Sequence, residues 1–291
     1  MTADYEEIRT HEHAIAQVVP LLAAMRSVAE MAFRRAEERL SPLARYAELL
    51  DAQLAQLGAS TEASFFGNAS RLKTLLIVIT SERGLCGAFN EHLFRSVVSD
   101  LRRRRAASEE IEIACFGSQG KRLFEEVKEP LVYWSGMPSL AVPSYADIEK
   151  AALEILDLME SRRCGWLVVT HNAPRRRFQY EVVSSQLFPF VSVIPSVPGE
   201  SPPVKPAEDA EHLLTHLVTE RVLIDLYRAV IQSAISEQLA RVAAMKLATD
   251  NAQKVLAQLT AEANRARQLM ETSALLEIMS GFEAASKREE G

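Results

Sequence analysis

The chain lacks glycine and proline over a long stretch, from Ala207 to Ser280. These two residues are the ones that most often end or break helices, so nothing in the stretch would stop a helix once it has begun. About 74 residues of continuous helix would extend about 110 Å, at about 1.5 Å of rise per residue. A helix of that length would project beyond any compact domain of this size, and the stretch therefore predicts a shaft.

Cysteine is scarce, with Cys86, Cys115 and Cys164 among 291 residues. The three are widely spaced, odd in number and outside any metal-ligand pattern. We therefore expect free thiols in a reducing compartment. The chain has two close histidine pairs, His11 with His13 and His212 with His216. Neither pair has a third ligand nearby, so we expect solvent-exposed side chains and no bound metal.

Long apolar runs are also missing, since none approaches the roughly 18 residues needed to cross a bilayer. The first residues, Met1 to Glu7, are acidic and lack the basic-then-apolar order of a signal peptide. The formal net charge is −6, which argues against nucleic acid as the main partner. The basic run Arg102–Arg105 is most simply the solvated C-terminal end of a helix, where cations complement the helix dipole.

Near the N-terminus, apolar residues recur every seven positions, which is the pattern of a coiled coil. The row consists of Ile8, Ile15, Leu22, Ala29, Ala36, Leu43, Leu50 and Leu57. We expect a helix over residues 1–58, ended by Gly58. Pro20 and Pro42 lie inside the pattern and should kink or interrupt the helix locally, unless Pro20 restarts it.

The C-terminal third carries a matching apolar row. Its members are Leu217, Ile224, Ile231, Met245, Ala252, Leu259 and Ala266. Gln238 interrupts the row, as a register-fixing polar residue can. Two such rows at opposite ends of one chain favour an antiparallel pair, so we expect residues 207–281 to pack along residues 1–58. A seven-residue repeat implies a left-handed supercoil.

Between the two rows, residues 73–205 alternate strand and helix patterns. Strands are expected at residues 74–80, 112–116 and 166–170, with an edge strand at 178–184, and helices at 90–105 and 146–163. The apolar run 74–80 is typical of a strand buried in a parallel sheet. Strand, helix, strand, helix, strand favours a three-layer, Rossmann-like α/β domain. The proline-rich segment 199–206 reads as a stiff linker back into the shaft.

The turn Ser81–Gly87 follows the first strand, at a place where α/β domains often bind phosphates. It contains neither a G-x-G-x-x-G pattern nor a Gly-Lys-Ser/Thr ending, so nucleotide binding is disfavoured. Cys86 in this turn could be a nucleophile near a helix N-terminus, but a small buried thiol fits better because no histidine is placed beside it. No catalytic constellation and no cofactor site emerge.

Three ordered segments carry a specific pattern. They read Ala24-Met25-Arg26-Ser27-Val28-Ala29 followed by Arg34-Arg35-Ala36; then Ser81-Glu82-Arg83-Gly84-Leu85-Cys86-Gly87-Ala88-Phe89-Asn90; and finally Ser236-Glu237 through Ala240-Arg241-Val242-Ala243-Ala244-Met245 to Ala248-Thr249-Asp250-Asn251-Ala252, continued by Asn264-Arg265-Ala266-Arg267-Gln268 and Leu276-Glu277-Ile278-Met279-Ser280-Gly281. On these segments the chain resembles the gamma subunit of the F-type ATP synthase, the central stalk, over nearly its whole length.

The resemblance implies a non-catalytic rotor subunit without a cofactor, since catalysis in that family belongs to the beta subunits. The coiled coil would stand inside a ring of three alpha and three beta subunits. The α/β foot would touch the epsilon subunit and the ring of c subunits, on the cytoplasmic face of a bacterial inner membrane. The membrane would be met only through that ring. The positions that match the family's beta-subunit contacts are Asn264, Arg267, Gln268, Met25, Arg83 and Cys86.

Several positions depart from the family's usual pattern, which suggests a divergent member. Gln232 stands where the family usually has glutamate, and Glu271 and Ala274 replace parts of an I-T-x-E-L run. Residues 193–198 replace an aromatic and acidic segment of the foot. Two rival classes follow: a coiled-coil scaffold derived from this family that no longer enters a rotary complex, and a free-standing nucleotide-dependent enzyme.

Overall fold

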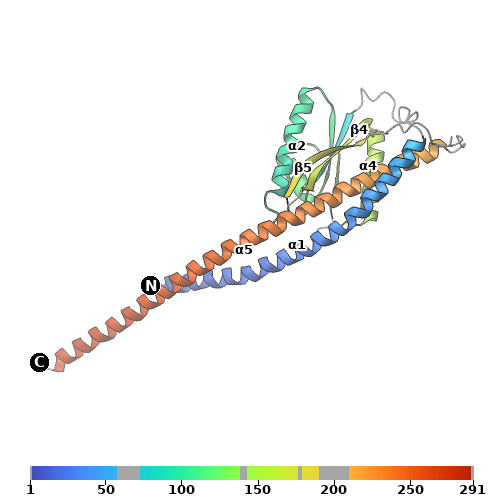
Figure 1. The fold of residues 1–291 in the computed structure, drawn as a ribbon. Helices are drawn as coiled ribbons and strands as arrows, with labels where there is room; N and C mark the ends of the chain where they lie inside the picture. The colour runs from blue at the N-terminus through green and yellow to red at the C-terminus, as the bar shows by residue number, and fades with distance from the viewer. Residues whose placement is uncertain (1, 58–72, 138–142, 176–178, 190–209, 290–291) are drawn as a thin grey trace. The chain divides into compact units, whose positions relative to one another are not determined.

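The computed structural model describes residues 2–57, 73–137, 143–175, 179–189 and 210–289. The chain divides into two compact units: Met1–Val28 with Ala244–Gly291, which we call the tip unit, and Ala29–Ala243, which we call the foot unit. Two helices run through both units, α1 (Thr2–Leu57) and α5 (Ala210–Glu289) (Figure 1). The expected long terminal helices are therefore confirmed.

The heptad row of α1 faces inward. Ala29, Ala36 and Leu50 are buried, and Ile8, Ile15, Leu22 and Leu43 are half-buried. The helix continues through both prolines, so the expectation of an interruption is wrong, while a local kink at either proline stays a prediction. Pro20 and Pro42 are exposed, and the fixed φ of proline is itself helical. Each proline therefore removes one ladder hydrogen bond on the outer face while the packed inner face stays intact.

In the tip unit, the row on α5 is buried or half-buried from Met245 to Ala266. The hydroxyl of Thr260 donates to Oε1 of Glu12 on α1 at 2.8 Å. In the foot unit, Asp51 near the end of α1 meets Arg221 near the start of α5, with Nε to Oδ1 at 2.6 Å. The two helices therefore pack side by side within each unit, antiparallel in direction (Figure 1).

The foot unit contains a five-stranded mixed sheet in the order β3-β2-β1-β4-β5. The strands are β1 (Lys73–Ile79), β2 (Ile111–Phe116), β3 (Tyr133–Ser135), β4 (Cys164–Arg175) and β5 (Gln179–Phe188). The first four pair in parallel, and β5 pairs antiparallel with β4. The shorter helices are α2 (Phe89–Ala106), α3 (Ser118–Glu126) and α4 (Tyr145–Arg162).

Alternation along β1 shows how the layers are built, since successive strand residues point to opposite faces. Leu75, Ile77 and Ile79 belong to a core cluster shared with α1, α4 and α5. Leu76 and Val78 belong to a second cluster shared with α2 and α3. The sheet therefore lies between two helical layers, which confirms the expected three-layer α/β fold.

The sequence missed two elements, α3 and β3. Helix α3 has nine residues and β3 has three, too few for a periodic pattern to stand out. The expected end at Gly58, the linker 199–206 and the altered segment 193–198 lie outside the described residues. The three-part division into 1–58, 73–205 and 207–281 therefore stays a prediction.

One expectation about membranes needs correction. Within Asp4–Leu54 of α1, an 18-residue window reaches a mean hydropathy of 1.3, so the helix is long and apolar enough to cross a bilayer by composition alone. A single helix of this kind is weak evidence. Only 6% of that window is buried, yet the same segment supplies heptad positions that face α5, which accounts for its apolar content.

Candidate functional site

The connection from β1 to α2 is a turn that folds on itself. The backbone N–H of Ser81 donates to Oδ1 of Asn90 at 3.0 Å, and Nδ2 of Asn90 donates to the Ser81 hydroxyl at 2.7 Å. That hydroxyl in turn donates to the carbonyl of Arg83 at 2.8 Å. Both Ser81 and Asn90 are buried. The turn therefore holds one shape through hydrogen bonds that its own residues supply.

The apex of the turn points outward. Leu85 has a φ of 63° and Gly87 a φ of 60°. For leucine this left-handed conformation costs roughly 1–2 kcal/mol, so the surrounding contacts must hold it. The Leu85 side chain is 63% exposed, and Arg83 is exposed beside it. The turn therefore presents one cation and one apolar side chain on a strained, fixed backbone.

Cys86 lies on the inner side of the same turn. Its side chain is 2% exposed, and its Sγ lies 3.5 Å from Nδ2 of Asn90 and 3.7 Å from the Ser81 hydroxyl. Burial raises the pKa of this thiol, which disfavours the thiolate that a nucleophile needs. The interpretation as a small buried thiol is confirmed. Cys86 can act on another protein only through the shape of the turn.

The turn docks on α5, and this contact joins two of the segments singled out from the sequence. Nη2 of Arg241 donates to the carbonyl of Gly84 at 3.3 Å and pairs with Oε1 of Glu237 at 2.6 Å. Ala240, Cys86 and Phe89 form a small buried cluster. Burial raises the pKa of Glu237, and the charge of Arg241 opposes that rise. We call this contact the turn–α5 junction.

A second clamp holds the other side of the turn. The carboxylate of Glu82 accepts from the backbone N–H of Ser118 at 3.1 Å and from that of Met137 at 3.0 Å. Burial acts to raise the pKa of Glu82, but these hydrogen bonds and one from the Ser118 hydroxyl lower it. Ser118 begins α3, and a helix N-terminus is where α/β folds often bind phosphate. Here the chain's own carboxylate takes that place.

Close backbone packing supports this clamp. Gly117 has a φ of 96°, and a Cβ there would lie 2.5 Å from the carbonyl oxygen of Thr80. The Thr80 hydroxyl donates to the carbonyl of Phe116 and accepts from the N–H of Gly120, each at 2.9 Å. Sequence reasoning missed Glu82 and Gly117 as supports of the turn. Glu82 binds Ser118 at the start of α3 and Met137 just beyond β3, next to the two elements that were not predicted, and Gly117 immediately precedes α3.

The remaining predicted site residues lie in the tip unit. Asn264, Arg267 and Gln268 are exposed on α5, and Met25 is half-buried on α1. Arg267 has an exposed partner in Glu271, with Nη1 to Oε1 at 3.8 Å, an arrangement that contributes little to stability. The structure therefore places three of the four on one open stretch of helix.

That stretch also exposes large apolar side chains that sequence reasoning did not single out. Leu269, Leu275, Leu276, Ile278 and Met279 are each 59–63% exposed. The sequence could have indicated them, because the heptad row of α5 stops near Met270 while large apolar residues continue beyond it. Several large apolar side chains exposed on one helix segment are typical of an interaction surface.

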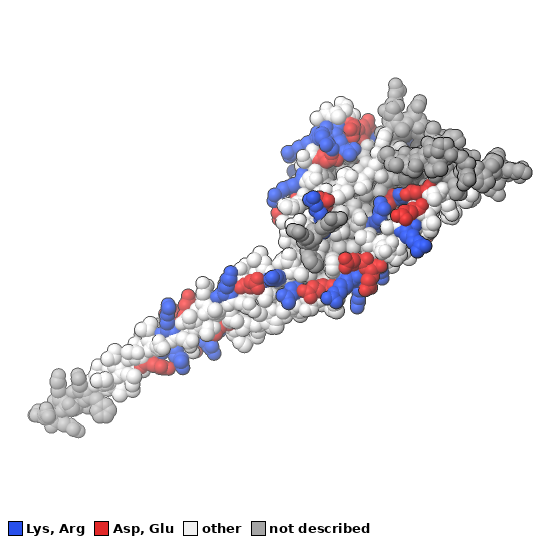
Figure 2. Space-filling view, in the orientation of Figure 1, with Lys and Arg blue, Asp and Glu red and all other residues white. Residues whose placement is uncertain are grey.

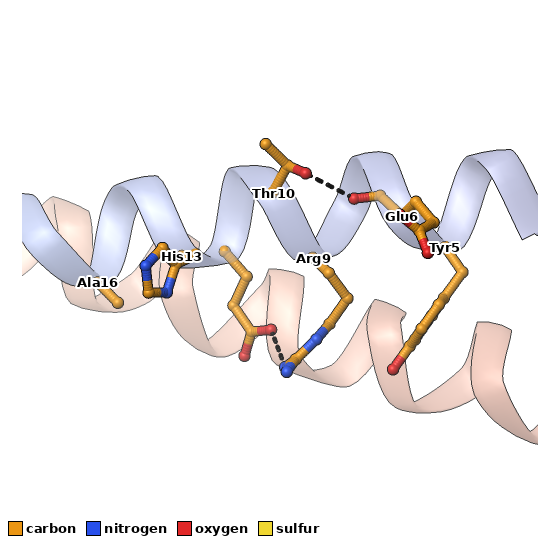
Figure 3. Close-up of a pocket in the computed structure, with 7 residues that line it drawn as sticks. Tyr5, Glu6, Arg9, Thr10, His13 and Ala16 are labelled. Atoms are coloured by element: carbon orange, nitrogen blue, oxygen red, sulfur yellow. Dashed lines mark hydrogen bonds and ion pairs between the residues drawn. The ribbon is translucent and has the colours of Figure 1, made fainter.

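The hollow drawn in Figure 3 lies on α1 in the tip unit and holds none of the predicted site residues. It is lined by Tyr5, Glu6, Arg9, Thr10, Glu12, His13 and Ala16. Arg9 pairs with Glu12 at 2.7 Å, and the Thr10 hydroxyl donates to the carbonyl of Glu6 (Figure 3). His11 and His13 are exposed, as expected.

Charge is mixed over the described face of the molecule, with acidic and basic side chains interspersed (Figure 2). The basic run Arg102–Arg105 forms the end of α2, as expected, and its last three members are ion-paired with Asp100, Glu109 and Glu129. Among the described residues, no cluster of three or more histidine, cysteine or acidic side chains could hold a metal ion.

Known proteins match this chain over almost its full length. A family model described as ATP synthase matches residues 4–285. The ATP synthase gamma chain of Jannaschia sp. (strain CCS1) is 30% identical over 281 residues, covering 90% of this chain and 92% of the relative. The gamma chain of Anaeromyxobacter sp. (strain Fw109-5) is 29% identical over 288 residues, covering 96% and 98%.

Solved structures show the same fold. The Euglena gracilis mitochondrial ATP synthase in its OSCP/F1/c-ring form, rotational state 3, contains a chain with a TM-score of 0.68 at 15% identity, covering 98% of this chain and 95% of that one. The rotor of the same enzyme in rotational state 1 gives a TM-score of 0.62 at 12% identity, covering 93% and 99%.

Proposed function

Because the chain belongs to the ATP synthase gamma chain family, we propose that it is the central-stalk rotor of an F-type ATP synthase. The coiled coil turns inside a ring of three alpha and three beta subunits. The foot unit binds the epsilon subunit and the ring of c subunits. This chain supplies no catalytic group, and nucleotide chemistry belongs to the beta subunits.

The turn–α5 junction is the observation that carries this proposal on the side of the structure. Arg241, which is paired with Glu237, joins the Ser81–Gly87 turn to α5, and Glu82 joins the turn to the start of α3 and to Met137, just beyond β3. The exposed side chains of Arg83 and Leu85 therefore move with the helix. A rotor needs such a fixed lateral projection, because a smooth cylinder would present the same surface to every subunit around it.

The physical logic of coupling follows from asymmetry. One shaft with one projecting turn cannot contact three chemically identical beta subunits in the same way. Each contact then has its own interaction free energy, and only such differences can favour one conformation over another. Turning the shaft cycles each beta subunit through its nucleotide affinities. Because coupling between sites is reciprocal, nucleotide hydrolysis in turn drives the shaft.

We assign the contacts to beta subunits as follows. Arg267, Gln268 and Asn264 meet a beta subunit at the tip, together with the exposed apolar side chains from Leu269 to Met279. Met25 contributes from α1. Arg83 contacts a beta subunit from the turn, while buried Cys86 supports the turn from inside.

The finer features of the assembly belong to the same proposal. Ion flow through the c ring drives the rotor, and the subunit is peripheral on the cytoplasmic face of a bacterial membrane. Residues 1–58 and 207–281 act as the shaft, and the α/β domain of residues 73–205, which lies within the foot unit, makes the contacts with the epsilon subunit and the c ring.

Assembly tests the proposal against its two rivals. Purified chain is mixed with the alpha and beta subunits encoded beside it, and the mixture is separated by size. The rotor function predicts one complex with three alpha and three beta subunits per chain and ATPase activity that depends on the chain. A scaffold outside the rotary complex would elute alone. Saturable ATP binding by the isolated chain would favour the enzyme.

A further inference from the structure

A buried polar pair joins β4 to α5 in the foot unit. His171 lies two residues beyond Val169 and so shares its face of β4, the face whose core cluster includes α5. Its Nε2 lies 2.9 Å from Oε1 of Gln232 on α5. His171 is only 2% exposed.

The placement of the Gln232 amide assigns the tautomer of the imidazole. With the amide oxygen toward the ring, Nε2 is the donor of this contact and Nδ1 is the unprotonated nitrogen of the neutral ring. Nδ1 is buried and has no hydrogen-bond partner among the described residues. A second proton would therefore create a buried N–H without an acceptor and a buried charge without a counter-ion, both of which are costly.

We propose that the His171–Gln232 pair is an acid-sensitive latch between the sheet and α5. The latch is closed while the imidazole is neutral. Protonation of Nδ1 weakens the attachment of α5 to β4. This inference concerns the cohesion of the foot unit and does not depend on the rotor function.

The charged groups around the pair reinforce this behaviour. Burial lowers the pKa of the His171 imidazole, the hydrogen bond with Gln232 acts to raise it, and the positive charge of Arg228 on α5 lowers it further. Asp225 faces Arg228, with Oδ1 to Nη2 at 3.1 Å. On β5, the residue opposite His171 is the uncharged Val183.

The nearest ionisable groups along the two strands form their own pair. Glu181 of β5 meets Arg175 of β4 at 3.2 Å, on the exposed part of the hairpin. Strand β1 ends beside this region at the buried, apolar Ile79. No carboxylate of the described chain acts on the imidazole to stabilise its charged form.

The sign of the effect follows from proton linkage. Well above pH 6.5, the ordinary pKa of histidine, His171 is neutral in both the folded and the unfolded chain and contributes no pH dependence. Below that value the unfolded chain binds a proton that the folded chain does not, so the folded state loses stability as pH falls. The folding equilibrium should fall by up to about tenfold per pH unit until the lowered pKa is reached.

Nuclear magnetic resonance of the full chain with labelled histidine tests the latch directly. The chain has six histidines, and the spectrum of His171→Gln identifies the signal of His171 by its loss. We expect this signal to keep the shift of the neutral ring as pH falls through 6. A change of this signal to the shift of the charged ring at or above pH 6.5, the ordinary pKa of histidine, would overturn the proposal.

Paired variants test the consequence for stability. Urea midpoints of wild type and His171→Gln are compared at pH 7.5 and pH 5.0, since glutamine can donate to Gln232 without titrating. The wild type should lose more stability in acid than this variant. His92→Gln, at an exposed position of α2, is the matched control and should behave like the wild type. Equal losses in all three proteins would refute the latch.

A charge placed at the acceptor should invert the effect. In Gln232→Glu, a carboxylate replaces the amide beside Nε2 and favours the charged imidazole. His171 should then titrate above pH 6.5, and the acid-induced loss attributed to it should disappear. Hydrogen exchange of the β4 amides would report the same change locally, with slower exchange at pH 5.0 than in the wild type. Unchanged exchange in acid would count against the proposal.

Discussion

Replacing Arg241 with alanine should destabilise the foot unit more than any change at an exposed arginine. The side chains of Arg241 and Glu237 are only 10% and 14% exposed, and their Nη2 and Oε1 atoms lie 2.6 Å apart. Arg241 also donates to Gly84 at 3.3 Å and to Gln238 at 3.0 Å. Arg241→Ala therefore leaves Glu237 buried without a cation and frees the turn from α5.

The expected magnitude follows from the cost of an uncompensated buried charge. Removing one partner of a buried pair typically costs about 3–5 kcal/mol. Replacing both partners by uncharged residues of similar volume is often close to neutral. The double variant Glu237→Gln with Arg241→Met should therefore lie within about 1–2 kcal/mol of the wild type, although it too loses the hydrogen bond to Gly84.

Urea unfolding of the full chain measures these differences, and pH gives a second check. In Arg241→Ala, nothing opposes the burial that raises the pKa of Glu237. The folded variant then takes up a proton at a higher pH than the unfolded chain does. The difference in free energy of unfolding between Arg241→Ala and the wild type should therefore shrink as pH falls from 7 toward 5.

Two results would refute this account of the junction. One is a loss below about 1 kcal/mol in Arg241→Ala, which would mean that solvent already screens Glu237. The other is an equal loss of unfolding free energy in Arg241→Ala and in the double variant, which would mean that lost packing and not the buried charge causes the effect. Hydrogen exchange at residues 81–90 should accelerate in both variants, since both release the turn.

Three further predictions follow from the turn and the tip. Gly117→Ala should lower the free energy of unfolding by at least about 2 kcal/mol, because it combines a φ of 96° with a Cβ only 2.5 Å from the carbonyl oxygen of Thr80. Gly84→Ala is the control, since no atom lies within 4 Å of its Cβ. Equal melting temperatures for the two variants would contradict the clash. Glu82→Gln should lower stability at pH 7 and match the wild type in acid. The lowered pKa of Glu82 gives stability that is present above the ordinary carboxyl pKa of 4.5 and is lost as pH falls through the lowered pKa. A stability difference between variant and wild type that does not change with pH would contradict the clamp. Arg267→Ala should impair coupled ATPase activity without changing the melting temperature of the isolated chain, and unchanged turnover would remove Arg267 from the proposed contact.

The sequence predicted the parts of the fold that repeat. The heptad rows of α1 and α5 extend over several periods, so both helices and their inward faces could be read directly, and the continuous apolar run of β1 indicated a strand buried on both faces. Pro20 and Pro42 misled the prediction because propensity describes isolated helices, whereas packing on the inner face holds α1 together. The short elements α3 and β3 left no periodic signal at all.

The site was predictable only as separate segments. Nothing in the spacing of Gly84 and Arg241 indicates that they touch, because 157 positions separate them and only the fold brings them together. The same holds for His171 and Gln232. Cys86 shows a different limit of prediction from a motif. The motif match suggested a residue that contacts a beta subunit, but the Cys86 side chain is buried inside the turn.

Direct observation of rotation tests the central claim. The three native cysteines are buried, so Arg102→Cys on the exposed end of α2 offers a single reactive site for a bead or gold particle. With the chain assembled among its own alpha and beta subunits on a surface, the rotor function predicts one-way rotation on addition of ATP, with three equivalent pauses in each turn. ATP hydrolysis by the same assemblies with a stationary probe would contradict it.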